Sequence, residues 1–186
     1  MTRVISVRLR ILLSDAGQEI IEAAIVFPLL FMLLLGIYWF GRAFNIYGTI
    51  NHAAREGARV AMVSSCASCG NAPASSSSLA TAVTNSLIAS RLDPNQAQAF
   101  TPTPAPVACQ AISAPLCSTV VLPPYTGTIY LCSPVQINPP PGASNSNPIC
   151  GVTVSFQYPY QFWFPFTSLN MQQVLLKASV QSYGEQ

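Results

Sequence analysis

The sequence predicts an α+β protein: a long N-terminal membrane-spanning helix, packed by a small antiparallel sheet domain with a second short helix and disulfide staples. Two observations carry this prediction. Between Glu22 and Arg42 lie 19 residues without a formal charge, most of them large and apolar. After residue 107 the chain consists of short β-prone runs separated by proline-rich turns. Helices followed by several strands are typical of an antiparallel sheet packed on helices.

The uncharged run is long enough to cross a membrane. A helix of about 20 residues, rising ~1.5 Å per residue, spans the roughly 30 Å hydrocarbon core of a bilayer. We place residues 20–41 in the membrane and expect one helix over residues 18–63. Past residue 53 the side chains on its apolar face are small, which permits close approach of another element. After Arg42 the apolar positions recur every three or four residues, at Phe44, Tyr47, Ile50, Ala54, Ala58 and Ala61.

The composition argues against several classes of function. Only 8% of the 186 residues are charged, and the net charge is +2, so no basic surface for nucleic acid is expected. His52 is the single histidine, and carboxylates are scarce after residue 64. General acid–base catalysis and metal binding both need several such groups together. We predict no enzyme activity, no cofactor, no metal and no nucleic-acid partner.

Residues 1–17 form a basic leader that ends at a glycine. The leader lacks the Ala-x-Ala cleavage site of an ordinary secretory signal. The sequence Gly17-Gln18-Glu19-Ile20-Ile21-Glu22 instead resembles the cleavage site of a type IV prepilin. The resemblance implies that a prepilin peptidase cuts between Gly17 and Gln18, so that Glu22 becomes the fifth residue of the mature chain.

Two further runs extend this resemblance to a family. V-F-P-L-L-F-M-L-L-L-G-I-Y-W-F-G-R at residues 26–42 and N-H-A-A-R-E-G-A-R at residues 51–59 are similar to the TadE/TadG-like family. These are minor pilin-like proteins of the tight-adherence (Flp) pilus. The resemblance implies a structural role in assembling that pilus, supporting surface attachment. The implied partners are the prepilin peptidase, other pilus assembly proteins, pilin-like subunits and inner-membrane lipid.

Glu22 and Pro28 are the helix residues that we expect to matter for assembly. A carboxylate within a lipid-buried helix is costly and is normally retained for a partner. A neighbouring subunit's α-amino group, released by cleavage at Gln18, can pair with Glu22 in a filament. Alternatively, Glu19 and Glu22 lie in the headgroup region, where the helix dipole favours them. Pro28 removes one hydrogen bond of the helix and predicts a kink.

Charge and cysteine placement orient the chain. Three arginines precede the span, but Arg42, Arg55 and Arg59 follow it, so the arginine rule is only suggestive. All six cysteines lie after residue 65, and disulfides form in oxidising compartments. We predict a single-pass protein of the bacterial inner membrane with a cytoplasmic N-terminus. Residues 64–186 then form a periplasmic α+β domain, which reaches the cell surface if the protein joins the pilus.

The outer domain is predicted from short local patterns. Apolar spacing over residues 79–92 predicts the second helix, which Asp93-Pro94 ends. Residues 101–106 are proline-rich and predict a stiff linker. Strands are predicted at residues 119–122, 128–137, 152–158 and 174–182, the last two paired with each other.

The cysteines are the disulfide candidates, namely Cys66, Cys69, Cys109, Cys117, Cys132 and Cys150. Many pairings are possible. We expect sequential closure, Cys66–Cys69, Cys109–Cys117 and Cys132–Cys150, because it makes three short loops. The Cys66-Ala-Ser-Cys69 motif also leaves open a redox site or half of a zinc site.

Two other functions remain compatible with the sequence. One is an unprocessed single-pass anchor that displays a disulfide-rich binding domain, which leader cleavage distinguishes from a pilin-like protein. The other is a membrane-anchored thiol-redox protein that uses Cys66 and Cys69. The second function requires a reactive thiol of lowered pKa.

Overall fold

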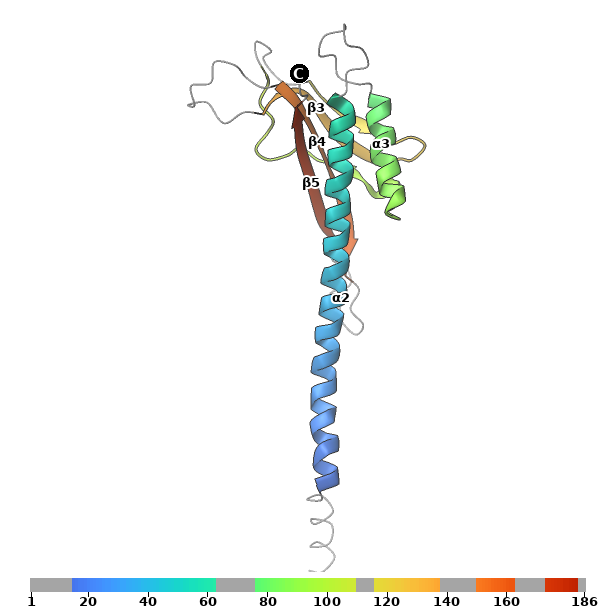
Figure 1. Cartoon of the computed structure of the whole chain (residues 1–186), viewed down its shortest axis with the longest axis vertical. Coiled ribbons are helices and arrows are strands. Elements are labelled where there is room, and N and C mark those ends of the chain that lie inside the picture. Colours follow the sequence, from blue (N-terminus) through green and yellow to red (C-terminus); the bar gives the residue numbers. More distant parts are fainter. Residues whose placement is uncertain (1–14, 63–75, 110–115, 138–149, 163–172, 184–186) are drawn as a thin grey trace, which may run out of the picture. The chain divides into compact units, whose positions relative to one another are not determined.

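The computed structural model describes residues 15–62, 76–109, 116–137, 150–162 and 173–183 (Figure 1). The chain divides into two compact units, Met1–Ala43 and Phe44–Gln186. The predicted α+β class is confirmed. The elements in chain order are α2 (Asp15–Met62), α3 (Ser76–Ala89), the 3-10 helix η1 (Pro94–Gln96), β1 (Gln98–Ala99), β2 (Leu116–Val121), β3 (Thr128–Gln136), β4 (Cys150–Gln161) and β5 (Gln173–Tyr183).

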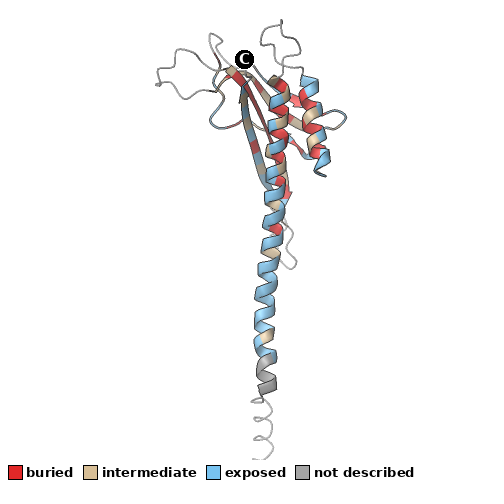
Figure 2. Ribbon diagram, in the orientation of Figure 1, coloured by how far each residue is buried: buried red, intermediate tan, exposed pale blue. Residues whose placement is uncertain are grey.

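In the first unit, α2 is an apolar helix whose side chains are mostly exposed, although Trp39 is buried. From Ile20 to Phe40 nearly every large apolar side chain is exposed, as the pale blue stretch of Figure 2 shows. Helix α2 is long and apolar enough to cross a membrane. An all-round apolar helix is stable only where something apolar surrounds it. This stretch fits a membrane anchor.

In the second unit, α2 buries one face and packs against α3. A Cβ atom on Gly57 would lie 2.6 Å from Val83 Cγ2, so the two helices approach closely there. The predicted close approach at the small residues is therefore confirmed. The buried α2 residues are Ile46, Ile50, Ala53, Ala54, Gly57, Ala58 and Ala61. The buried α3 residues are Leu79, Ala80, Val83, Thr84 and Leu87.

Helix α3 ends with a left-handed residue that is not glycine. Arg91 has φ of 59°. The N–H of Leu92 donates to the carbonyl of Leu87, and the N–H of Arg91 donates to that of Ile88. These two bonds are a Schellman cap, which satisfies the last carbonyls of the helix. The helix therefore ends earlier than the predicted residue 92.

The strands that the structure describes belong to one antiparallel sheet with β4 in the middle. Strand β5 pairs with β4 along its whole length, from Gly151↔Tyr183 to Gln161↔Gln173. On the other edge of β4 lie β3 and then the short β1, and β2 lies beyond β3. The predicted pairing of the last two strands is confirmed.

The sheet is covered on both faces, because all residues of β4 from Gly151 to Phe156 are buried. On one face Ser155 Oγ donates to the carbonyl of Phe100 at 2.9 Å. The ammonium of Lys177 lies 5.4 Å from the centre of the Phe100 ring. Pro102 is buried. The proline-rich run predicted as a linker is thus packed on the domain.

The disulfides differ from the predicted sequential closure. The bonds are Cys109–Cys150 and Cys117–Cys132. Cys117 lies directly opposite Cys132 in the pairing of β2 with β3, which brings their Cα atoms within 4.1 Å. The register of the strands, which local loop length does not encode, therefore sets the pairing. Cys66 and Cys69 lie outside the described residues.

Candidate functional site

The predicted cleavage site lies at the beginning of α2. Gly17 and Gln18 belong to its first turn, since the helix begins at Asp15.

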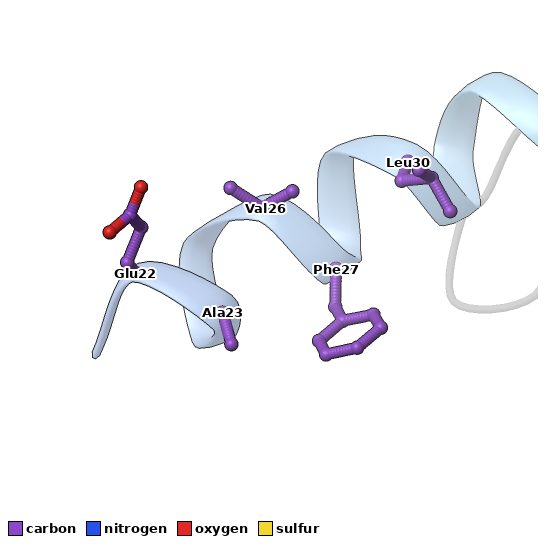
Figure 3. A pocket seen from close by; sticks show the side chains of 5 residues that line it. All are labelled: Glu22, Ala23, Val26, Phe27 and Leu30. Carbon is purple, nitrogen blue, oxygen red and sulfur yellow. The ribbon is translucent and has the colours of Figure 1, made fainter. Parts of the chain in front are cut away.

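Glu22 stands about one turn after that bond, on an open apolar face of the helix. Figure 3 shows its carboxylate extended away from the ribbon, with Val26 the next side chain along the same side. All other residues that line this open hollow are apolar, namely Ala23, Val26, Phe27 and Leu30. Sequence reasoning singled out Glu22 but missed this face, although its positions are three and four residues apart.

The chemistry of this face is that of a docking surface with one charge. Apolar side chains provide contact area, and a carboxylate in such surroundings needs a cation to offset its desolvation. A helix that presents apolar residues and one ammonium group is the complementary partner. Glu22 is the one titratable side chain among the described residues that line this face.

Pro28 lies inside α2 and is exposed. A proline has no N–H, so the carbonyl of Ala24, four residues earlier, receives no helical hydrogen bond from it. The helix runs on through this position from Asp15 to Met62. A kink at Pro28 remains a prediction.

The A-A-R-E-G-A-R run at residues 53–59 has a clear structural role. Its alanines and Gly57 are buried, whereas Arg55 and Arg59 are exposed. Gly57 contacts Val83 and Leu79 of α3, so the run is the part of α2 that holds the second helix. The sequence predicts close approach along the small residues of this run without singling out Gly57 as the point of contact.

The described residues outside this segment offer little chemistry. His52 Nδ1 lies 3.4 Å from Ser86 Oγ on α3, at an exposed position. Among the described residues, no three histidine, cysteine, aspartate or glutamate side chains gather as metal ligands would. The four described cysteines are oxidised.

An exposed apolar helix that leads into a disulfide-bonded α+β unit fits a membrane-anchored protein. Residues 17–59 match the model of the TadE-like protein family. The predicted resemblance is thereby confirmed over this segment. The match begins at the predicted cleavage glycine and ends with the run that holds α3. No curated protein and no solved structure matches the chain.

Proposed function

We propose that this protein is a pilin-like structural and assembly component of a tight-adherence pilus. A prepilin peptidase cuts it between Gly17 and Gln18, and the mature chain assembles through α2 to support surface attachment. One observation carries the proposal: the family match starts at Gly17 and covers the bare apolar stretch of α2.

Cleavage changes the electrostatics of the helix end. It removes the leader with Arg3, Arg8 and Arg10 and leaves one new cation, the α-amino group of Gln18. That amine belongs to the turn before Glu22. Because like groups repeat from subunit to subunit, the amine of one chain can neutralise Glu22 of the next. Such a pair fixes the axial register of neighbouring helices, while the apolar face around Glu22 supplies the contact area.

The chemistry of the second unit supports a location outside the cytoplasm. Its disulfides Cys109–Cys150 and Cys117–Cys132 require an oxidising compartment. A single apolar helix precedes them in the chain. We place residues 20–41 in the inner membrane, the N-terminus in the cytoplasm and the disulfide-bonded unit in the periplasm.

The direct test is the N-terminus of the mature protein. The full chain is expressed with and without a prepilin peptidase, extracted from membranes, and examined by intact mass and N-terminal sequencing. We expect the chain to begin at Gln18 only when the peptidase is present. Gly17→Val, which places a β-branched side chain beside the bond, should leave the leader intact. An intact leader in the wild-type protein, with the peptidase active on a known prepilin, contradicts the proposal.

The compactness of the second unit favours one alternative, an unprocessed membrane anchor that displays a binding domain. The same cleavage experiment separates the two. A thiol-redox function rests on Cys66 and Cys69 alone. It predicts that a thiol reagent labels these residues after mild reduction that leaves Cys109–Cys150 and Cys117–Cys132 closed, and protection of both from labelling under those conditions would exclude it.

A further inference from the structure

The exposed surface of the second unit changes from apolar to polar along α2. Phe44 is 72% exposed and Tyr47 is 48% exposed. Beyond them the exposed positions of the helix carry His52, Arg55 and Arg59. Phe44 and Tyr47 are large, neighbouring and exposed at the beginning of the second unit. Exposed apolar side chains that lie together often mark a contact surface, so we expect this turn to contact an apolar partner.

The same change occurs on β5. Val174 and Leu175 are each 42% exposed. Because successive residues of a strand point to opposite faces, the strand is apolar and bare on both sides at its beginning. From Lys177 to Gln181 its exposed residues are polar, namely Lys177, Ser179 and Gln181, and Tyr183 at the end of the strand is exposed as well.

These two apolar stretches belong to the same end of the second unit. Val174 pairs with Tyr160 near the end of β4. Figure 1 shows the arrowhead of β4 and the beginning of β5 at the level where α2 enters the unit. We call Phe44, Tyr47, Val174 and Leu175 the aromatic–aliphatic rim. The chain continues from this rim directly into the bare apolar stretch of α2.

We propose that the aromatic–aliphatic rim lies in the headgroup region of the bilayer, so that the foot of the folded unit rests in the membrane surface. Large aromatic side chains with an apolar body and a polar tip concentrate at this depth. The helix from Ile20 to Tyr47 measures about 40 Å along its axis. That length matches a whole bilayer with its headgroups, about 40–45 Å, rather than the hydrocarbon core alone.

This inference rests on the proposed membrane position of residues 20–41 and extends it to two further elements. Asn45 and Gln173 are exposed polar residues beside the rim. Headgroups accept such residues, whereas the hydrocarbon core does not. Contact with lipid through both α2 and β5 would attach the second unit to the membrane surface at two places. Two attachments restrict rotation of the unit about the helix axis.

The test is photo-crosslinking of the full chain in vesicles of phosphatidylethanolamine and phosphatidylglycerol. The photoreactive residue p-benzoylphenylalanine replaces Tyr47 or Leu175 in separate variants. It replaces Tyr183 in the matched control, a tyrosine that is 55% exposed at the other end of β5. That end lies about 30 Å along the strand from Val174 at ~3.3 Å per residue. A fourth variant carries the probe at Phe31, within the proposed span.

We expect mass spectrometry to find lipid adducts at positions 31, 47 and 175, several times more abundant than at position 183. All four positions are exposed, so the buried core is untouched, and a non-reducing gel verifies the disulfides. Adducts at position 31 without adducts at 47 and 175 overturn the rim and leave the span intact. A lack of lipid adducts at position 31 overturns the span itself. Crosslinks from 47 and 175 to a second copy, instead of lipid, also overturn the rim.

Discussion

At the scale of single residues, Glu22 is the position where the proposed assembly is most open to test. Its carboxylate stands among Ala23, Val26, Phe27 and Leu30, and Glu19 precedes it by three residues. We expect Glu22→Gln to leave cleavage after Gly17 unchanged and to reduce recovery of the mature chain with pilus subunits severalfold, because the neutral amide cannot pair with an amine.

Glu19→Gln is the matched control for that experiment, since it removes the same charge near the same helix end. We expect near wild-type recovery from it. Co-purification from crosslinked membranes measures both variants. Equal recovery of the Glu22 and Glu19 variants would show that total charge, rather than a specific pair, is what matters.

Tyr158 gives the fold a dependence on alkaline pH. Burial raises the pKa of its phenol above the ordinary 10.0, and the nearby charge of Asp93 adds to this. The backbone N–H of Asp93, which donates to the phenol oxygen at 3.1 Å, acts in the opposite direction. The folded state therefore holds this proton at a pH where the unfolded chain has lost it. The stabilisation of the folded state that comes from the protonated Tyr158 phenol is fully present below pH 10. It decreases as the pH rises above 10.

We expect the melting temperature of Tyr158→Phe to fall less between pH 8 and pH 11 than that of the wild-type protein. At pH 8 the variant should be about 1 kcal/mol less stable, because the Asp93 N–H loses its acceptor. Thermal unfolding of the detergent-solubilised protein measures both effects. Tyr183→Phe, at an exposed position, is the control. An unchanged pH dependence in the Tyr158 variant would refute this role.

At the scale of elements, the contact of α2 with α3 depends on a missing side chain. Gly57→Ala would place a methyl group 2.6 Å from Val83 Cγ2, and Val83 is fully buried and stiff at χ1. Overpacking of this kind costs about 1–3 kcal/mol, more than the ~1 kcal/mol that alanine adds to helix propensity. We expect a net loss of stability.

Gly48→Ala in the same helix is the matched control. A Cβ atom there meets nothing within 4 Å, so only the gain in helix propensity remains, about 1 kcal/mol. The two substitutions should shift the melting temperature in opposite directions. If both raise it, α2 and α3 separate enough to admit a methyl group, and the close contact is wrong.

The cap of α3 offers a stabilising change. Arg91 has φ of 59°, a conformation that costs an L-residue about 1–2 kcal/mol and glycine almost nothing. Glycine also makes the unfolded chain more flexible, which offsets part of the gain. We expect Arg91→Gly to stabilise the protein by up to about 1 kcal/mol in chemical denaturation. A destabilised variant would mean that the arginine side chain contributes a contact worth more than the strain.

At the scale of the whole molecule, the disulfides close loops of different length. Cys109–Cys150 spans 41 residues and Cys117–Cys132 spans 15. The chain-entropy model gives about 4 and about 3 kcal/mol for loops of these lengths. We expect Cys109→Ala with Cys150→Ala to lower stability more than the other paired replacement. Peptic peptides of the native protein test the pairing itself, and a Cys109–Cys117 peptide would contradict it.

The local features of the chain were predictable because they depend on periodicity. The uncharged run predicts a bare helix, and the small residues after position 53 predict a close contact, which Gly57 makes with Val83. Alternation over residues 152–158 predicts β4 and its pairing with the final strand. The spacing of apolar side chains predicts each of these elements, but the alternation in β4 does not show that the strand is buried on both faces.

Other features depend on residues that are distant in sequence. Strand β1 has only two residues, and it exists because Gln98 and Ala99 pair with β4. The proline-rich run after Phe100 packs on the sheet through a hydrogen bond from Ser155. A short polar or proline-rich segment carries no period from which such partners can be inferred.

The sequence by itself determined the long apolar helix, the resemblance of the segment from Gly17 onward to the TadE-like family, the order of the two helices and the longer strands, and the number of cysteines. Only the tertiary structure decided which cysteines bond, how α3 meets α2, and where the apolar rim lies. The physical reason is that one element needs only its own spacing of side chains. Register and closure, in contrast, minimise the free energy of the whole unit, so that Cys117 meets Cys132 across a strand pair.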